Sequence, residues 1–154
     1  MPEARASEVA SCGSHSRRSG EPLIVLDASA AVDYLIEAAA EGMWVRDTIE
    51  SEPEVAAPHV IDLEVLSSLR QLVSRRELQI RRADEALFDY NELELIRYPA
   101  TPLLARIWSL RTHLTPYDAS YVALSEVLGV PLVTTDLRLA RSHGHRAEVI
   151  AYPS

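Results

Sequence analysis

The chain has 154 residues, of which 47% are hydrophobic and 25% are charged, so it is long enough to bury the core of one compact domain. Its formal net charge of -8, from 23 acidic and 15 basic residues, argues against a protein that coats nucleic acid non-specifically. The charge does not exclude a nuclease, because carboxylates that hold divalent cations are counted here without their metal.

The first 21 residues have the composition of a polar tail. They lack the apolar stretch of a secretory signal, and they contain Glu3 and Glu8, which are untypical of a transit peptide. Cys12 is the single cysteine, which excludes a disulfide framework and a cysteine-rich zinc site and favours a reducing, cytoplasmic setting. We therefore expect a disordered leader over residues 1–21, one domain over 22–154 and no membrane span.

From residue 22 onward, short apolar runs alternate with longer helical patterns. The expected strands are 23–27, 54–58, 95–99, 131–136 and 147–152. The expected helices are 29–39, 42–51, 60–74, 81–94, 102–112, a helix that begins at Pro116, and 137–143. This alternation predicts an α/β fold, a three-layer α/β/α sandwich with a mainly parallel central sheet, in which ligands bind at the carboxyl ends of the strands.

Three aspartates fall at the ends of these elements. Asp27 is the last residue of the expected strand 23–27, Asp136 is the last residue of the expected strand 131–136, and Asp118 lies in the first turn of the helix that begins at Pro116. Each has an alternative, purely structural interpretation, because aspartate is a good N-cap and Thr115-Pro-Tyr-Asp118 fits a capping pattern beside the positive end of a helix dipole. Each aspartate alone is therefore weak evidence for a functional site.

Glu64 is a fourth candidate, on helix 60–74. Its neighbours at helical spacing are apolar or small, and Leu63, Leu66 and Leu69 form an adjacent apolar stripe. A carboxylate on a largely buried helix face is costly unless its charge is compensated. Glu64 therefore either reaches solvent, pairs with an arginine, or joins the three aspartates.

Carboxylates crowded into one place repel each other and take up protons unless cations lie between them. Hard oxygen ligands of this kind suit Mg²⁺ or Mn²⁺, and a pair of such ions can activate water and stabilise the leaving oxygen of a phosphodiester. The hydroxyls of Ser29, Thr134 and Thr135 are candidates to orient ligands or water from behind, although such residues at helix starts are commonly caps. The pattern thus favours a metal-dependent nuclease.

Four segments resemble, in order and spacing, the four acidic motifs of the PIN-domain ribonucleases, and most closely the VapC toxins of bacterial toxin–antitoxin pairs. They are IVLDASAAVDYL (24–35), DLEVLSSL (62–69), LTPYDASYVALSE (114–126) and PLVTTDLRLA (131–140). The resemblance covers roughly residues 23–152 and implies a catalytic set of Asp27, Glu64, Asp118 and Asp136, here called the acidic quartet. It also implies that Asp27 and Asp118 bind metal directly, that Asp136 contributes more variably, and that Thr134 fills the usual hydroxyl position. The 20-residue leader departs from the pattern of these toxins.

By the same resemblance, the protein is expected to be an Mg²⁺- or Mn²⁺-dependent endoribonuclease that dimerises and is silenced by a cognate VapB-type antitoxin in a hetero-oligomer. The alternative is a non-catalytic module on the same fold, in which the acids bind metal or an arginine-bearing peptide. An intact quartet favours the enzyme. A phospho-acceptor receiver domain is disfavoured, because such a domain needs a lysine and all 15 basic residues are arginine.

Other candidates are weaker. His143 and His145 lack a third ligand at a fixed spacing, so an exposed turn is expected there. The basic cluster of Arg75, Arg76, Arg81 and Arg82 either guides RNA or forms a solvated face with salt bridges to Glu77, Asp84 and Glu85. The apolar residues Trp44, Leu78, Ile80 and Trp108 either face a partner or belong to the core.

Overall fold

The computed structural model describes residues 23–37, 39–51 and 54–153. The expected leader over 1–21, and Cys12 with it, lies outside the described residues. Within the described ranges, every helix is too short or too polar to cross a membrane.

The described residues confirm the predicted α/β fold and the order of its elements. The strands are β1 (Leu23–Leu26), β2 (Glu54–Pro58), β3 (Leu95–Tyr98), β4 (Leu132–Thr134) and β5 (Val149–Ala151). The helices are α2 (Ala28–Ile36), α3 (Ala39–Glu50), α4 (Ile61–Ser74), α5 (Ile80–Glu92), α6 (Leu104–Ser109), α7 (Pro116–Leu128) and α8 (Leu137–Ala140), with the 3₁₀ turn η1 (Thr101–Leu103) before α6.

The largest departures from the sequence expectation are near the C-terminus. Strand β4 ends at Thr134, because Asp136 already serves as the N-cap of α8. Helix α8 ends at Ala140, and the following residues up to Glu148 are irregular before β5 begins.

A further departure lies before α7. The region expected as helix 102–112 begins with η1, which has a proline in its first turn, and α6 ends at Ser109.

The sheet has the strand order β3-β2-β1-β4-β5, and every neighbouring pair is parallel. Strand β1 lies at the centre, where Val25 pairs with Ala56 of β2 on one side and Leu132 of β4 on the other. All four residues of β1 are buried, as expected for a parallel strand covered on both faces. The connections run in opposite directions from β1, so the switch point of the topology, where ligands bind in folds of this kind, lies between the carboxyl ends of β1 and β4.

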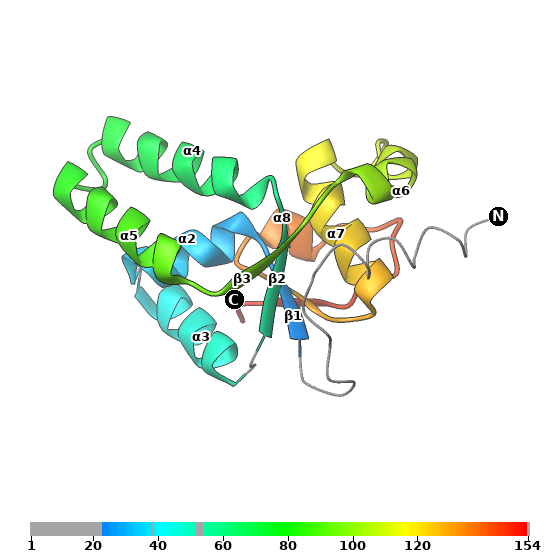
Figure 1. The fold of residues 1–154 in the computed structure, drawn as a ribbon, viewed down its shortest axis with the longest axis horizontal. Coiled ribbons are helices and arrows are strands. Elements are labelled where there is room, and N and C mark those ends of the chain that lie inside the picture. Colours follow the sequence, from blue (N-terminus) through cyan, green and yellow to red (C-terminus); the bar gives the residue numbers. More distant parts are fainter. Residues whose placement is uncertain (1–22, 38, 52–53, 154) are drawn as a thin grey trace.

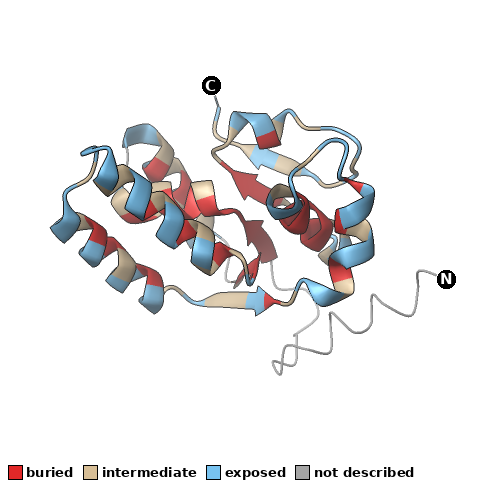
Figure 2. Ribbon diagram, turned by 90° about the horizontal axis from the view of Figure 1, so that it is seen from above, coloured by how far each residue is buried: buried red, intermediate tan, exposed pale blue. Residues whose placement is uncertain are grey.

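Helices cover both faces of this sheet (Figure 1). Helix α7 packs against β1, β2 and β4, whereas α2 packs against α3, α4 and α5 on the other side. Buried residues concentrate in the central strands and on the helix faces turned toward them (Figure 2). In α7 the buried run continues from Ala119 to Ser125, and its small residues allow the helix to approach the sheet closely.

Helix α4 shows which stripe faces the core. Its buried residues are Ile61, Val65 and Leu69, which recur at helical spacing. Leu63 and Leu66, which belonged to the expected apolar stripe, are 69% and 45% exposed. They lie outside this contact because the stripe through Ile61 and Val65 faces the core, where α4 packs against α2 and α5.

We predict that Gly42 is required for the close contact between α2 and α3. A Cβ at this buried position would lie 2.4 Å from the carbonyl oxygen of Asp33 in α2. Alanine favours helices over glycine by about 1 kcal/mol, but overpacking costs about 1–3 kcal/mol and here the obstacle is backbone. Gly42→Ala should therefore lower the free energy of unfolding in urea titrations, whereas Met43→Ala, at an exposed neighbour, should change it by less than about 0.5 kcal/mol. A Gly42→Ala protein as stable as the wild type would contradict the close contact.

Candidate active site

Asp27 is the most buried member of the acidic quartet, with 4% exposure. It follows β1 and caps α2, where its Oδ1 accepts a hydrogen bond of 2.9 Å from the backbone N–H of Ala30. The hydroxyl of Ser29 donates to Oδ1 at 2.8 Å, and that of Thr134 donates to Oδ2 at 2.5 Å. Burial raises the pKa of Asp27 to about 6, although these hydrogen bonds lower it, and the charge of Asp136 adds to the rise. Hydrogen bonds thus hold both carboxylate oxygens, but they do not fully offset the cost of burying the negative charge.

Asp136 lies beside Asp27 because β4 neighbours β1 in the sheet. The hydroxyl of Thr134, which donates to Asp27, also accepts the backbone N–H of Asp136 at 3.0 Å. Asp136 caps α8 through the backbone N–H of Arg138 at 2.7 Å and pairs with its guanidinium at 3.1 Å. Burial opposes ionisation here, but the contacts with Arg138 prevail and lower the pKa of Asp136.

Glu64 and Asp118 form the other half of the quartet. The half-buried Glu64 extends from α4, and its Oε2 accepts a hydrogen bond of 2.6 Å from the hydroxyl of Tyr121 in α7. Asp118 lies in the first turn of α7, where the hydroxyl of Thr115 donates to its Oδ2 at 2.9 Å and accepts its backbone N–H at 3.2 Å. Burial raises the pKa of Glu64, the Tyr121 hydroxyl lowers it, and the charge of Asp118 raises it further.

The structure brings all four acids to one edge of the sheet. Asp136 acts electrostatically on Asp27, and Asp118 acts on Glu64. Tyr121 and Arg138 connect the two halves, because the Tyr121 hydroxyl experiences the charges of Glu64 and Asp27 while Arg138 experiences those of Asp136 and Asp118. In Figure 1, α2, α4, α7 and α8 begin around this same end of the central strands.

The capping interpretations of the aspartates are confirmed. Asp27 and Asp136 accept backbone N–H bonds as N-caps, and Thr115 is the N-cap that accepts the N–H of Asp118. Capping by Asp27 and Asp136 occupies one carboxylate oxygen of each, and the other oxygen accepts from side chains, those of Ser29 and Thr134 for Asp27 and that of Arg138 for Asp136. The predicted supporting hydroxyls of Ser29 and Thr134 do contact Asp27.

Sequence reasoning missed two polar neighbours of the quartet, Tyr121 and Arg138, and one further half-buried acid, Asp33. Tyr121 was part of an apolar helical run, yet its position one turn after Asp118 was the available signal. Arg138 follows Asp136 by two residues and pairs with it. Asp33 lies one helical turn past Ser29 and is half-buried, which raises its pKa, while a hydrogen bond with the side chain of Thr135 lowers it.

The donor atoms around this edge fit a hard divalent cation. Among the described residues, the recorded partners of Asp27, Glu64 and Asp118 are hydroxyl and backbone N–H groups, whereas Asp136 pairs with an arginine. Carboxylates without a cationic partner are the ligands that Mg²⁺ and Mn²⁺ prefer. In the part of the chain that the structure describes, no three histidine, cysteine, aspartate or glutamate side chains lie close enough together to hold one metal ion between them. The four carboxylates are therefore separate oxygen donors along one edge of the sheet.

The histidines that the structure describes take no part in the hydrogen bonds of the quartet. The rings of His113 and His143 lie 4.8 Å apart, centre to centre, and both residues are exposed. The Nε2 atom of His145 lies 2.9 Å from the hydroxyl of Ser142. The expected exposed turn is confirmed for His143, whereas His145 is partly buried.

The basic cluster forms ion pairs along α5. Arg81 and Arg82 each approach Glu85, at 3.3 and 4.0 Å, and Arg82 also donates to the backbone carbonyl of Leu35 at 2.6 Å. These contacts correspond to the solvated face with salt bridges that was one of the two interpretations. Arg75 and Arg76 are exposed at the end of α4.

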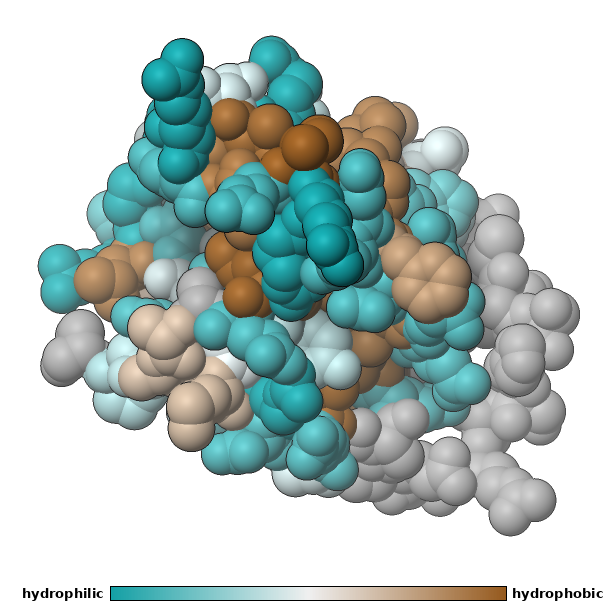
Figure 3. Space-filling view, turned by 90° about the vertical axis from the view of Figure 1, so that its left-hand side faces the viewer, coloured by the Kyte–Doolittle hydropathy of each residue, from teal (hydrophilic) through white to brown (hydrophobic). Residues whose placement is uncertain are grey.

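Two of the four apolar candidates face outward. Ile80 is 63% exposed and Trp108 is 68% exposed, whereas Trp44 and Leu78 pack against the core. Ile80 and Leu66 line an apolar groove of about 250 Å³ between α4 and α5. Brown apolar side chains interrupt the teal charged ones on this side of the molecule (Figure 3).

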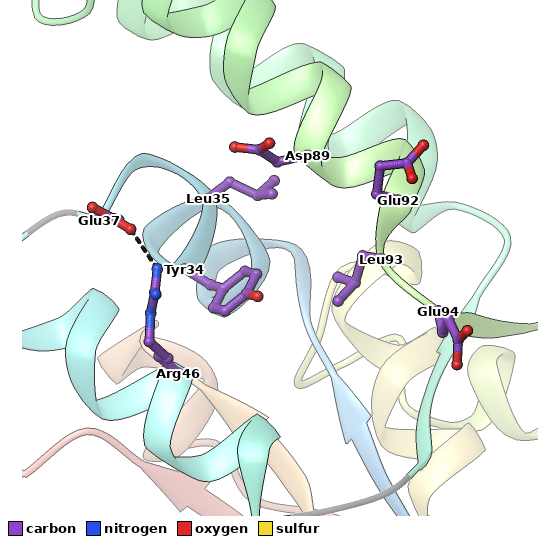
Figure 4. A pocket seen from close by; sticks show the side chains of 8 residues that line it. All are labelled: Tyr34, Leu35, Glu37, Arg46, Asp89, Glu92, Leu93 and Glu94. Carbon is purple, nitrogen blue, oxygen red and sulfur yellow. Dashed lines mark hydrogen bonds and ion pairs between the residues drawn. The ribbon is translucent and has the colours of Figure 1, made fainter.

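A second hollow, of about 350 Å³, lies between α2, α3 and the end of α5 (Figure 4). Arg46 pairs with Glu37 across it and lies over the ring of Tyr34. The residues that line it include none of the acidic quartet, so it is separate from the candidate site.

Comparisons with known proteins agree with this geometry. The model of the PIN domain family matches residues 24–143. The chain is 42% identical over 127 residues to Ribonuclease VapC12 of Mycobacterium tuberculosis strain H37Rv, which covers 82% of this chain and 97% of that protein. The fold is similar to that of VapC20 from Mycobacterium tuberculosis, described as a sarcin-ricin loop cleaving toxin, with a TM-score of 0.58, 16% identity and coverage of 76% and 92%. It is also similar to a chain of VapBC2 from Rickettsia felis, crystallised with a promoter DNA fragment, with a TM-score of 0.57, 14% identity and coverage of 85% and 99%.

We predict that Asp27 destabilises the metal-free protein at neutral pH. Its folded-state pKa of about 6 exceeds the ordinary 3.8, so the folded protein retains the proton longer than the unfolded chain and stability falls as pH rises from about 4 to above 6. At about 1.4 kcal/mol per pH unit, the penalty at pH 7.5 reaches at most about 3 kcal/mol. Asp27→Asn should therefore raise the free energy of unfolding by about 1–3 kcal/mol at pH 7.5 in EDTA, with little difference at pH 4.

The control is Asp89→Asn, which changes an exposed aspartate on α5. It should leave the pH dependence of the free energy of unfolding unchanged. Equal pH dependence for the Asp27→Asn variant and the wild type would show that the Asp27 carboxyl is not desolvated.

Proposed function

Because the chain belongs to the PIN-domain family and, within it, to the VapC ribonucleases, we propose that it is a metal-dependent endoribonuclease that hydrolyses RNA phosphodiesters and acts as the toxin of a VapBC-type pair. The observation that carries this proposal is the meeting of the acidic quartet at one sheet edge. Its four members come from segments spread over 110 residues of sequence, and three of them have no arginine among their recorded partners in the described residues.

Asp27, Asp118 and Asp136 are the residues proposed to hold Mg²⁺ or Mn²⁺. A divalent cation bound there favours the ionisation of water and offsets negative charge that develops on the phosphate. The protein fixes the directions in which the carboxylate oxygens point. For Asp27, the hydroxyls of Ser29 and Thr134 do this by donating hydrogen bonds to its two oxygens.

Within the quartet, Glu64 is the residue best placed to accept a proton during the reaction. One of its oxygens is bonded to Tyr121, and the other has no recorded partner in the described part of the chain. The pKa of Glu64 is raised, chiefly by burial, which brings it closer to neutral pH and suits a general base that accepts a proton from the attacking water.

Arg138 supplies positive charge next to the acids. Its side chain is 89% exposed while it pairs with Asp136, so the guanidinium faces solvent beside this acid. An arginine fork is suited to paired contacts with phosphate oxygens, and we assign Arg138 to the positioning of the RNA backbone.

The proposed partners follow from the family. The structural relative VapBC2 is a VapB–VapC pair, and we propose that this chain likewise dimerises and is bound by a VapB-type antitoxin whose C-terminal segment covers the acidic quartet. The proposed compartment is the cytoplasm, where cellular RNA is the substrate. The competing function is a non-catalytic module in which the same acids bind metal or an arginine-bearing peptide.

The decisive experiment is cleavage of total RNA by purified, antitoxin-free protein in Mg²⁺, in Mn²⁺ and in EDTA, with mapping of new RNA ends. We expect discrete cuts that require metal and that Asp118→Asn reduces by at least about 100-fold, because a direct metal ligand is lost. Asp84→Asn, which alters an exposed aspartate on α5, serves as the matched control and should cut like the wild type. Absence of cutting by folded protein with either metal would favour the interaction module.

A further inference from the structure

Two tyrosine hydroxyls contact acids on helix α4 in the same way. Tyr121 of α7 donates to Oε2 of Glu64 at 2.6 Å, and Tyr90 of α5 donates to Oδ1 of Asp62 at 2.6 Å. Both tyrosines are buried, with exposures of 2% and 4%. They differ in what their acids do, since Glu64 belongs to the acidic quartet whereas Asp62 forms an ion pair with Arg97 at 2.9 Å.

Tyr121 lies one helical turn after Asp118, so both residues occupy the face of α7 that approaches Glu64. Burial raises the pKa of the Tyr121 hydroxyl, and its contact with Glu64 and the charge of Asp27 raise it further, so the hydroxyl remains a proton donor. The charges of Glu64 and Asp27 both act on this hydroxyl, so acids from both halves of the quartet influence it.

This bond determines how Glu64 can be used. Tyr121 is the recorded hydrogen-bond partner of Glu64 in the described residues, and it engages one carboxylate oxygen. Removal of the hydroxyl would leave a half-buried carboxylate without a donor and free to rotate about its terminal bond. A phenylalanine side chain would fill the same space in the core, so the packing role of the ring is separable from the role of the hydroxyl.

We propose that Tyr121 is a positioning residue that holds the carboxylate of Glu64 by one oxygen beside Asp118 and leaves the other oxygen for the reaction. This inference rests on the proposed nuclease function. It assigns Tyr121 to the control of turnover through Glu64, and to the control of cation affinity through the negative charge that Glu64 places beside Asp118, one of the proposed cation ligands. Neither role requires contact with the RNA.

The test compares Tyr121→Phe with Tyr90→Phe in the full chain, after circular dichroism has established that both variants are folded. Mn²⁺ affinity is measured by electron paramagnetic resonance, and kcat and KM are measured on an RNA fragment that the wild type cuts. We expect Tyr121→Phe to weaken Mn²⁺ binding by about 10-fold and to lower kcat by about 10-fold, as for the loss of other groups that orient a ligand. KM for RNA should stay within about twofold, and Tyr90→Phe should change neither quantity by more than about twofold.

A double-mutant cycle identifies the residue through which Tyr121 acts. In a Glu64→Gln background, Tyr121→Phe should have no further effect on Mn²⁺ affinity. A full additional loss in that background, equal losses in Tyr90→Phe, or a Tyr121→Phe protein that matches the wild type would each overturn the assignment.

The outcomes separate this inference from the proposed function. A wild type that binds Mn²⁺ and cuts RNA, with a Tyr121→Phe variant that does both equally well, overturns the inference and leaves the nuclease in place. A wild type that binds Mn²⁺ but cuts no RNA overturns the nuclease, and the comparison of Mn²⁺ affinities still decides the role of Tyr121.

Discussion

The site depends on one hydroxyl group, that of Thr134. It donates to the buried carboxylate of Asp27 and accepts the backbone N–H of Asp136, so it ties the end of β1 to the turn after β4. Without this bond, the Thr134 hydroxyl would no longer join the two aspartates directly. The parallel sheet brings β1 and β4 side by side. The hydrogen bonds of the Thr134 hydroxyl then fix how Asp27 and Asp136 lie relative to each other.

The same edge combines structural and chemical roles in single residues. Asp27 and Asp136 start helices and still bring carboxylate oxygens to the shared edge of the sheet, and Thr115 starts α7 while it holds Asp118. Helix N-termini favour negative charge, which partly offsets the repulsion between the acids. Because one residue can both begin a helix and contribute to the site, the capping interpretation of each aspartate was correct and is compatible with a shared site.

The fold could be predicted because buried parallel strands and amphipathic helices leave distinct patterns. The three aspartates could be predicted to share one edge because they lie at element ends, whereas Glu64 could be placed only on a helix able to face them. Tyr121 could not, because a tyrosine within a buried helical run has the pattern of ordinary core and its hydroxyl meets Glu64 only after α4 and α7 pack. The exposure of Leu63 was missed for a related reason, since which stripe of an apolar helix faces inward is decided by its neighbours.

The raised pKa of Asp27 has a consequence for how the protein exchanges ions with its surroundings. Below about pH 6, a cation that binds this carboxylate must displace a proton, so cation uptake releases acid and its apparent affinity falls as the solution becomes more acidic. The heat of cation binding then depends on the ionisation enthalpy of the buffer. A buried carboxylate in the proposed metal site therefore also couples that site to the acidity of the medium.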